Sequence, residues 1–253
     1  MVHITKKDLD KDNYYKDNGI NTDEFITCDE NLGYIKFKKS VITTKSIKFG
    51  FGCGIEAGNG IEAGYGIEAG YGINAGCGIR AGNGIEAGYG IRAGYGIRAG
   101  CGIEAGCGIN AGNGIEAGYE INAGDGIEAG YGIRAGCGIR AGCGIRAGCG
   151  INAGNGIEAG YEINAGDGIE AGYGINAGYG IEAGYGIRAG CGIRCKGILK
   201  FSYQLFAGTY IWRATTKKDL IIECGKLETD GKIVLGNLKE IGNIPEKMQK
   251  IIK

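Results

Sequence analysis

Residues 55–194 consist of one hexapeptide, Gly-Ile-(Glu/Arg/Asn)-Ala-Gly-(Tyr/Cys/Asn/Asp), repeated with few departures. Isoleucine recurs at every sixth position from Ile55 to Ile193, which gives 24 copies. A strict short repeat is typical of stacked folds in which each unit buries its apolar face against its neighbours. Collagen would need glycine at every third position and abundant proline, whereas this chain has a single proline, Pro245.

Positions of the hexapeptide are numbered here from the isoleucine. Position 1 is always isoleucine, and position 3 is alanine in every copy except the last, which has Cys195. Side chains alternate across an extended strand, so positions 1 and 3 share one side and position 2, with Glu, Arg or Asn, takes the other. We therefore predict an apolar core of isoleucine and alanine. Its representative isoleucines are Ile55, Ile91, Ile127, Ile163 and Ile193.

The remaining positions predict the corner between strands. Position 4 is glycine in every complete copy, whereas position 6 accepts Glu120 and Glu162. A site that tolerates only glycine needs either a positive φ or a close approach of backbone. Position 5 exchanges Tyr, Cys, Asn and Asp, a mixture that a close-packed interior would not accept. We therefore expect the corner at positions 4 and 5, with position 5 facing solvent and the strand running from position 6 to position 3.

Charges at position 2 indicate how many strands make one coil. Charges in register on neighbouring strands interact directly. A coil of three hexapeptides stacks six opposite-charge and three like-charge pairs, whereas a coil of two hexapeptides stacks six and seven. The sequence thus predicts an all-β, single-stranded, three-sided β-solenoid with three hexapeptides per coil and one hexapeptide per side.

The sequence also predicts the boundaries of the solenoid. Upstream, Ile35, Val41 and Ile47 keep the spacing of six with degenerate residues between them. Downstream we expect strands, a hairpin that turns at Asp230-Gly231 and a short helix after Pro245. The predicted segments are a polar N-terminal arm or cap (1–34), a degenerate first coil (35–54), the perfect solenoid (55–194) and a β-hairpin and helix cap (195–253).

Composition argues against several classes of function. Lysine plus arginine equals aspartate plus glutamate, at 28 each, and no basic stripe favours nucleic acid. The repeats contain no histidine, since the chain has only His3. Seven cysteines exchange with tyrosine at position 5, which argues against a disulfide framework and for reduced thiols in the cytoplasm. We predict no enzyme activity, no catalytic, cofactor or metal residues, no small-molecule substrate, no signal peptide and no membrane segment.

The hexads GIEAG and GINAG resemble two families of solenoid proteins. The left-handed hexapeptide acyltransferases share the three-sided design, but they place a small residue before the aliphatic one and use a catalytic histidine. The bactofilin-like polymer-forming proteins carry coils similar to residues 35–194. That resemblance implies a filament that assembles end to end.

Three functions follow from these observations. The leading one is a non-enzymatic structural or protein-interaction rod, with specificity in its caps and in its tyrosine-bearing and charged faces. Its predicted partner contacts lie in the C-terminal cap and are Trp212, Tyr210, Phe206 and Tyr203. The alternatives are a bactofilin-like self-assembling filament, and an inhibitor from a phage or mobile element that occludes a host nucleoprotein complex.

Overall fold

The structure, a computed structural model, describes residues 1–209 and 216–242. It divides into two compact units, Met1–Gly130 and Tyr131–Lys253. Each unit is built from short parallel strands, and the helix that the described residues contain is a single turn of 3-10 helix, η1 (Lys6–Asp8). The predicted helix after Pro245 lies outside the described residues.

Each perfect repeat forms a short strand, Ile-x-Ala. In β13 (Ile91–Ala93), Ile91 and Ala93 are buried and Arg92 between them is exposed. This alternation follows from the period of two along a strand. The strand covers positions 1 to 3 and is one residue shorter than predicted, because position 6 already belongs to the connection.

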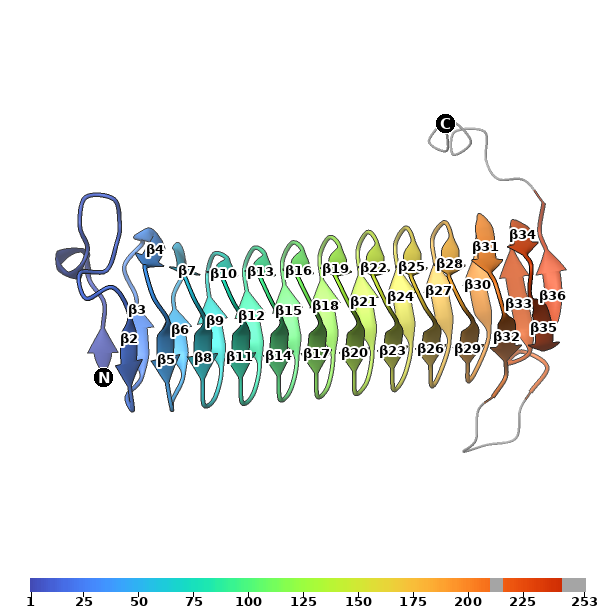
Figure 1. Cartoon of the computed structure of the whole chain (residues 1–253), viewed down its shortest axis with the longest axis horizontal. Coiled ribbons are helices and arrows are strands. Elements are labelled where there is room, and N and C mark those ends of the chain that lie inside the picture. The colour runs from blue at the N-terminus through green and yellow to red at the C-terminus, as the bar shows by residue number, and fades with distance from the viewer. Residues whose placement is uncertain (210–215, 243–253) are drawn as a thin grey trace. The chain divides into compact units, whose positions relative to one another are not determined.

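Successive coils stack in register, with one coil for every three hexapeptides. Ile91 pairs with Ile73 on one side and with Ile109 on the other, both in parallel strands. The amide of Ile73 donates to the carbonyl of Gly90 in the coil ahead at 3.0 Å, and that of Gly76 donates to Ala57 in the coil behind at 2.9 Å. Three strands complete one coil, so each unit is a three-sided β-solenoid, as predicted (Figure 1).

The first unit has three parallel sheets, which we call its first, second and third faces. The first face contains, in spatial order, β1 (Val2–His3), β3 (Ile26–Cys28), β6 (Ile47–Phe49), β9 (Ile67–Ala69), β12 (Ile85–Ala87), β15 (Ile103–Ala105) and β18 (Ile121–Ala123). The second face contains β4 (Gly33–Phe37), β7 (Cys53–Ala57), β10 (Ile73–Ala75), β13, β16 (Ile109–Ala111) and β19 (Ile127–Ala129). The third face contains β2 (Ile20–Thr22), β5 (Val41–Thr43), β8 (Ile61–Ala63), β11 (Ile79–Ala81), β14 (Ile97–Ala99) and β17 (Ile115–Ala117).

The second unit repeats this arrangement. One sheet contains β21 (Ile139–Ala141), β24 (Ile157–Ala159), β27 (Ile175–Ala177), β30 (Ile193–Cys195), β33 (Ile221–Cys224) and β36 (Asn237–Glu240). Another contains β22 (Ile145–Ala147), β25 (Ile163–Ala165), β28 (Ile181–Ala183), β31 (Ile198–Phe201) and β34 (Lys226–Thr229). The third contains β20 (Ile133–Ala135), β23 (Ile151–Ala153), β26 (Ile169–Ala171), β29 (Ile187–Ala189), β32 (Gln204–Ala207) and β35 (Lys232–Leu235).

The core is a column of isoleucine and alanine, widened by phenylalanine in the coils outside the perfect repeat. All five isoleucines predicted to lie in the core are at most 1% exposed. They are Ile55, Ile91, Ile127, Ile163 and Ile193. In the first unit Phe37 and Phe49 occupy position 3 in place of alanine, and in the second unit Phe201 does the same.

Solenoid strands begin earlier than the sequence pattern indicated. Residues 1–34, expected as a polar arm or cap, contain β1, β2 and β3, and β2 and β3 pair in parallel with β5 and β6. The isoleucines of β2 and β3 keep the spacing of six, but the spacing from Ile26 to Ile35 is nine. The longer connection interrupts the periodicity and hides these strands.

The predicted hairpin at Asp230-Gly231 is wrong. Strands β34 and β35 flank this turn but belong to different sheets, where they pair in parallel with β31 and β32. The turn is therefore another corner of the solenoid. An Asp-Gly pair is a good hairpin signal in isolation, but here each strand finds its partner one coil back and continues the stack.

The corner glycines at position 4 are required by close approach rather than by a positive φ. The positive-φ glycines of the described residues are Gly33, Gly52, Gly208, Gly236 and Gly242, all outside the perfect repeat. A Cβ atom on Gly94 would instead overlap the carbonyl oxygen of Gly76 in the coil behind. At position 6 a Cβ on Gly96 would lie 3.3 Å from the carbonyl oxygen of Gly114.

This difference predicts unequal effects for two alanine substitutions in the same corner. Gly94→Ala should lower the free energy of unfolding by about 1–3 kcal/mol, because backbone must move to relieve the overlap. Gly96→Ala is the matched control and should change it by no more than about 0.5 kcal/mol. Denaturant unfolding and hydrogen exchange of residues 73–114 measure both effects. Equal effects would contradict the assignment of position 4 to the close approach.

Candidate functional site

The outward side chains at position 2 form ladders, since each lies in register with its counterpart three repeats away. Opposite charges meet on several of these ladders. In the first unit Arg98 contacts Glu116 at 2.5 Å between Nη2 and Oε2. In the second unit Arg140 contacts Glu158 at 3.3 Å, and Lys200 contacts Glu182 at 2.6 Å. Exposed pairs of this kind contribute at most about 1 kcal/mol each, so the ladders organise charge more than they stabilise the fold.

The first face of the first unit departs from this pattern. Glu68, Glu86 and Glu104 lie in direct register on β9, β12 and β15, so that Glu86 has a glutamate on both sides. We call these three residues the acidic ladder. The next residue at the N-terminal end, Lys48, contacts Glu68 at 3.2 Å, and the next at the other end is Asn122. Like charges in register disfavour folding, so the acidic ladder is not explained by stability.

A trough of about 670 Å³ runs beside the acidic ladder. Position-6 glycines, with no side chain, form part of its lining along Gly66, Gly84 and Gly102. Met1 and Phe25 line it towards the N-terminal coil, while Tyr119, Glu120 and Asn122 line it around β18. Phe25 and Tyr119 are 48% and 60% exposed, which makes them available to a bound molecule. The trough therefore combines glutamate carboxylates with exposed aromatic rings.

Tyrosines at position 5 form a second kind of ladder at the corners. Tyr71 and Tyr89 meet edge to face with ring centroids 5.4 Å apart. In the second unit Tyr161 and Tyr179 stack at 5.2 Å, and Tyr179 is buried with no hydrogen-bond partner for its hydroxyl group among the described residues. Burial raises the pKa of the Tyr179 hydroxyl. Stacked rings stabilise neighbouring coils, so part of the tyrosine content serves the fold.

The predicted partner contacts are distributed over different environments. Tyr203 is 48% exposed and stacks on Tyr185 with ring centroids 4.7 Å apart. Phe206 is half-buried on β32, where the guanidinium carbon of Arg188 lies 5.3 Å from its ring centroid. The other two predicted contacts, Tyr210 and Trp212, lie outside the described residues.

Within the described residues, β34, β35 and β36 form the last coil of the second unit. Among residues 1–209 and 216–242, no strand pairs with its outer edge. Leu227 occupies position 1 of β34. In an inner coil the amide of the position-1 residue donates a hydrogen bond to a carbonyl oxygen of the next coil, as Ile163 does to Gly180 at 3.1 Å. The Leu227 amide donates instead to the Glu240 carboxylate at 2.8 Å. A side chain thus replaces the missing coil at one point.

The last coil carries several exposed apolar side chains. The exposed ones are Val234, Leu235, Leu238 and Ile241, with exposures between 37% and 46%. Position 1 of an inner coil is buried by its two neighbours, but Leu238, in register with Ile222, has a described neighbour on one side only. Four exposed apolar residues within eight positions of the chain make this coil a candidate interaction surface. Sequence analysis missed them because it assigned the segment to a hairpin.

The described residues hold no group of three or more His, Cys, Asp or Glu side chains suited to a metal ion. Cys195 and Cys224, which are buried, are poor nucleophiles. Burial raises the pKa of Cys195 to about 12 and that of Cys224 to about 11, so both thiols stay protonated at neutral pH. No helix among these residues is both long and apolar enough to cross a membrane.

Comparisons with protein-family models, curated proteins and solved structures find no match to this chain. The solenoid itself is shown by the structure, and the likeness to bactofilins stays a prediction from the repeat.

The acidic ladder predicts a substitution that stabilises the protein. Glu86→Arg replaces two repulsive contacts by two attractive ones and should raise the free energy of unfolding by about 0.5–2 kcal/mol. The gain should shrink with added salt, because exposed charges are screened. Glu116→Arg is the reverse control, since it places like charges beside Arg98, and should destabilise. Denaturant unfolding at low and high salt measures both, and a loss of stability in Glu86→Arg would contradict the ladder.

Proposed function

We propose that this protein is a non-enzymatic solenoid that binds another protein through its C-terminal cap. The observation that carries the proposal is the last coil, whose outer edge is unpaired among the described residues and whose apolar side chains are exposed. An open strand edge offers backbone hydrogen bonds to a partner strand, and apolar side chains beside it add affinity. Tyr203 and Phe206 lie one coil inside this end, on or next to β32.

Two features support binding at the end over binding along the faces. The perfect repeats present similar side chains at every coil, whereas the last coil differs from all of them in sequence. Interface centres are enriched in aromatic and large apolar residues. Along the faces such residues occur mainly as tyrosines, and several of these already stack on one another.

A closed pair of identical chains is a second candidate, favoured by the unequal treatment of the two terminal coils. In the first unit the backbone of residues 13–15 covers the outer edge of β4: the Tyr15 amide donates to Lys36 at 2.8 Å, and the Lys36 amide donates to Asn13 at 2.9 Å. A filament needs two complementary ends, whereas contact through one end gives a closed two-fold dimer. Among the described residues the outer edges of β1 and β2 stay unpaired. The covered edge of β4 thus reduces, on one face, the surface open to end-to-end assembly, and to that extent it favours a dimer over the bactofilin-like filament.

Substitution of exposed residues on the last coil tests the proposal. Leu238→Gln combined with Ile241→Gln should weaken partner binding at least about tenfold, as expected when central apolar contacts are lost. Tyr131→Ala, also exposed and in the same unit, is the matched control and should leave binding unchanged. In-cell crosslinking would first identify the partner, and titration of the purified pair would then measure affinity.

The outcome also separates the two candidates. If the second copy is the partner, light scattering should show a concentration-dependent dimer that the double substitution abolishes. If the partner is another protein, the purified chain stays monomeric and only the heterologous complex weakens. If the double variant keeps both the dimer and the heterologous complex, while Tyr131→Ala weakens binding, the proposal is contradicted and binding is placed on the faces.

A further inference from the structure

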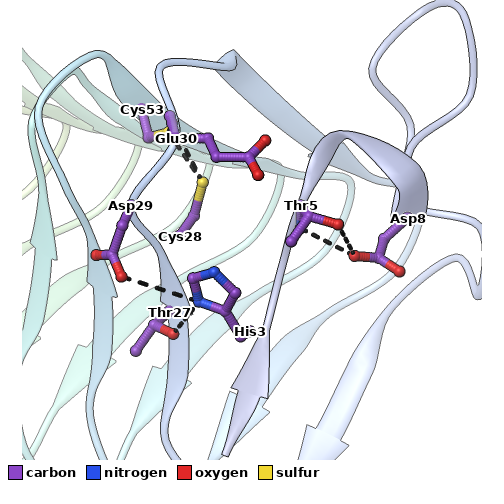
Figure 2. Close-up of polar contacts among 8 residues, drawn as sticks. All are labelled: His3, Thr5, Asp8, Thr27, Cys28, Asp29, Glu30 and Cys53. Carbon is purple, nitrogen blue, oxygen red and sulfur yellow. Dashed lines mark hydrogen bonds and ion pairs between the residues drawn. The ribbon is translucent and has the colours of Figure 1, made fainter.

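Two cysteines near the N-terminus of the first unit lie unusually close together. Cys28 ends β3 on the first face, and Cys53 begins β7 on the second face. Their sulfur atoms are 3.0 Å apart, and both side chains are fully buried (Figure 2). A disulfide bond has a length of about 2.05 Å, so the two atoms need to approach by only about 1 Å to bond.

The local backbone directs both thiols to one point. The Cys53 Sγ atom lies 2.5 Å from the Glu30 carbonyl oxygen, and the Cys28 Sγ atom lies 3.5 Å from the same oxygen. Cys53 sits where the spacing of six fails, since the spacing from Ile47 to Ile55 is eight. The extra residues include Gly52, whose φ is +80°, followed by Cys53, which faces inward. These thiols are unlike the seven at position 5, which exchange with tyrosine at the corners.

We propose that Cys28 and Cys53 form a reversible disulfide that staples together two adjacent coils near the N-terminal end of the first unit. Cys53 on β7 stacks in register on Gly33 of β4, the strand that follows Cys28 in the chain. Cys53 therefore lies one coil further along than Cys28, and the bond crosses from one coil to the next. In reducing compartments disulfides are usually transient and redox-sensing. The Cys28–Cys53 pair therefore forms its disulfide in response to peroxide, and the cysteines at position 5 take no part in that bond.

Hydrogen peroxide supplies the oxidant. The thiolate of one cysteine attacks a peroxide oxygen, the O–O bond breaks, and hydroxide leaves, which gives a sulfenic acid. The second thiol then attacks that sulfur, the S–O bond breaks, and the oxygen leaves as water. In total two thiols and one peroxide give one disulfide and two waters, so the protein loses two electrons and two protons.

The buried environment sets the rate of this reaction. Burial, together with the hydrogen bond and charge of Cys53, raises the pKa of the Cys28 thiol to about 12. The carboxylate of Glu30 acts in the same direction, and His3, Asp8 and Asp29 are the other titratable groups drawn around this site (Figure 2). Only thiolate reacts, so oxidation is slow at neutral pH and requires sustained peroxide or a local opening of the end coil. The pair is thus a sensor of sustained oxidation.

Peptide mapping of the oxidised full-length protein tests the proposal. Trypsin cleaves after residues 16, 36, 48 and 80, so Cys28 lies in the peptide 17–36 and Cys53 in the peptide 49–80. The second peptide also contains Cys77, so the experiment uses a Cys77→Ser background in which Cys53 is its only cysteine. After peroxide treatment, mass spectrometry without reductant should find the two peptides linked, and reductant should separate them.

Hydrogen exchange provides the second readout. The staple should slow exchange of the amides of residues 20–37 at least about tenfold, since a crosslink restrains local opening. Cys101→Ser, an exposed corner cysteine, is the control and should keep this protection, whereas Cys28→Ser and Cys53→Ala should each lose it. Because exchange is compared before and after oxidation of the same variant, a variant that folds less well remains interpretable.

Linked peptides with added protection support the staple. Sulfinic acid at either cysteine without a link, or a link without added protection, would overturn it.

Discussion

The close approach of each position-4 glycine to the carbonyl group of the coil behind sets the geometry on which the rest of this structure depends. With no Cβ at that corner, the chain turns and returns in register after three repeats, as Gly94 does over Gly76. The register places isoleucine on isoleucine and alanine on alanine, which closes the core column. It also aligns the position-2 residues into ladders and the position-5 residues into corner columns. The contacts between charges and between tyrosine rings on neighbouring coils both depend on that register.

Uniform coils give a solenoid little means of building a specific site, so function is expected where uniformity fails. Three such places are seen within the described parts of the two units. The acidic ladder stacks three like charges, the two-residue extension before Cys53 brings two thiols together, and the last described coil leaves apolar residues exposed. Each departs from what stability alone would favour. The apolar residues belong to the last described coil, whose unpaired strand edge must be covered or used for binding, and the cysteine pair lies near the N-terminal end of the first unit.

The fold could be predicted from the sequence because isoleucine recurs at every sixth residue and so gives the length of the repeat directly. Isoleucine at position 1 and alanine at position 3 indicated the inward face, and the charges at position 2 indicated the three-sided coil. The candidate surfaces were less accessible. The ladder of Glu68, Glu86 and Glu104 was available from their spacing of three repeats once the coil was known. The cysteine pair and the last coil carry no periodic signal, since Cys28 precedes an irregular connection and Asp230-Gly231 suggests a hairpin when its strands are considered without their stacked partners.

The coil of three hexapeptides is the central claim, and photo-crosslinking tests it without using any native cysteine. A photoreactive phenylalanine analogue at residue 98 on β14 should crosslink to the coil neighbours around Arg80 and Glu116, which lie in register with it. Mass spectrometry of the digested protein identifies the linked residues. Crosslinks centred three repeats away in both directions are the predicted result. Crosslinks centred two repeats away, around positions 86 and 110, would contradict the three-sided coil and with it the ladders, the staple and the open end.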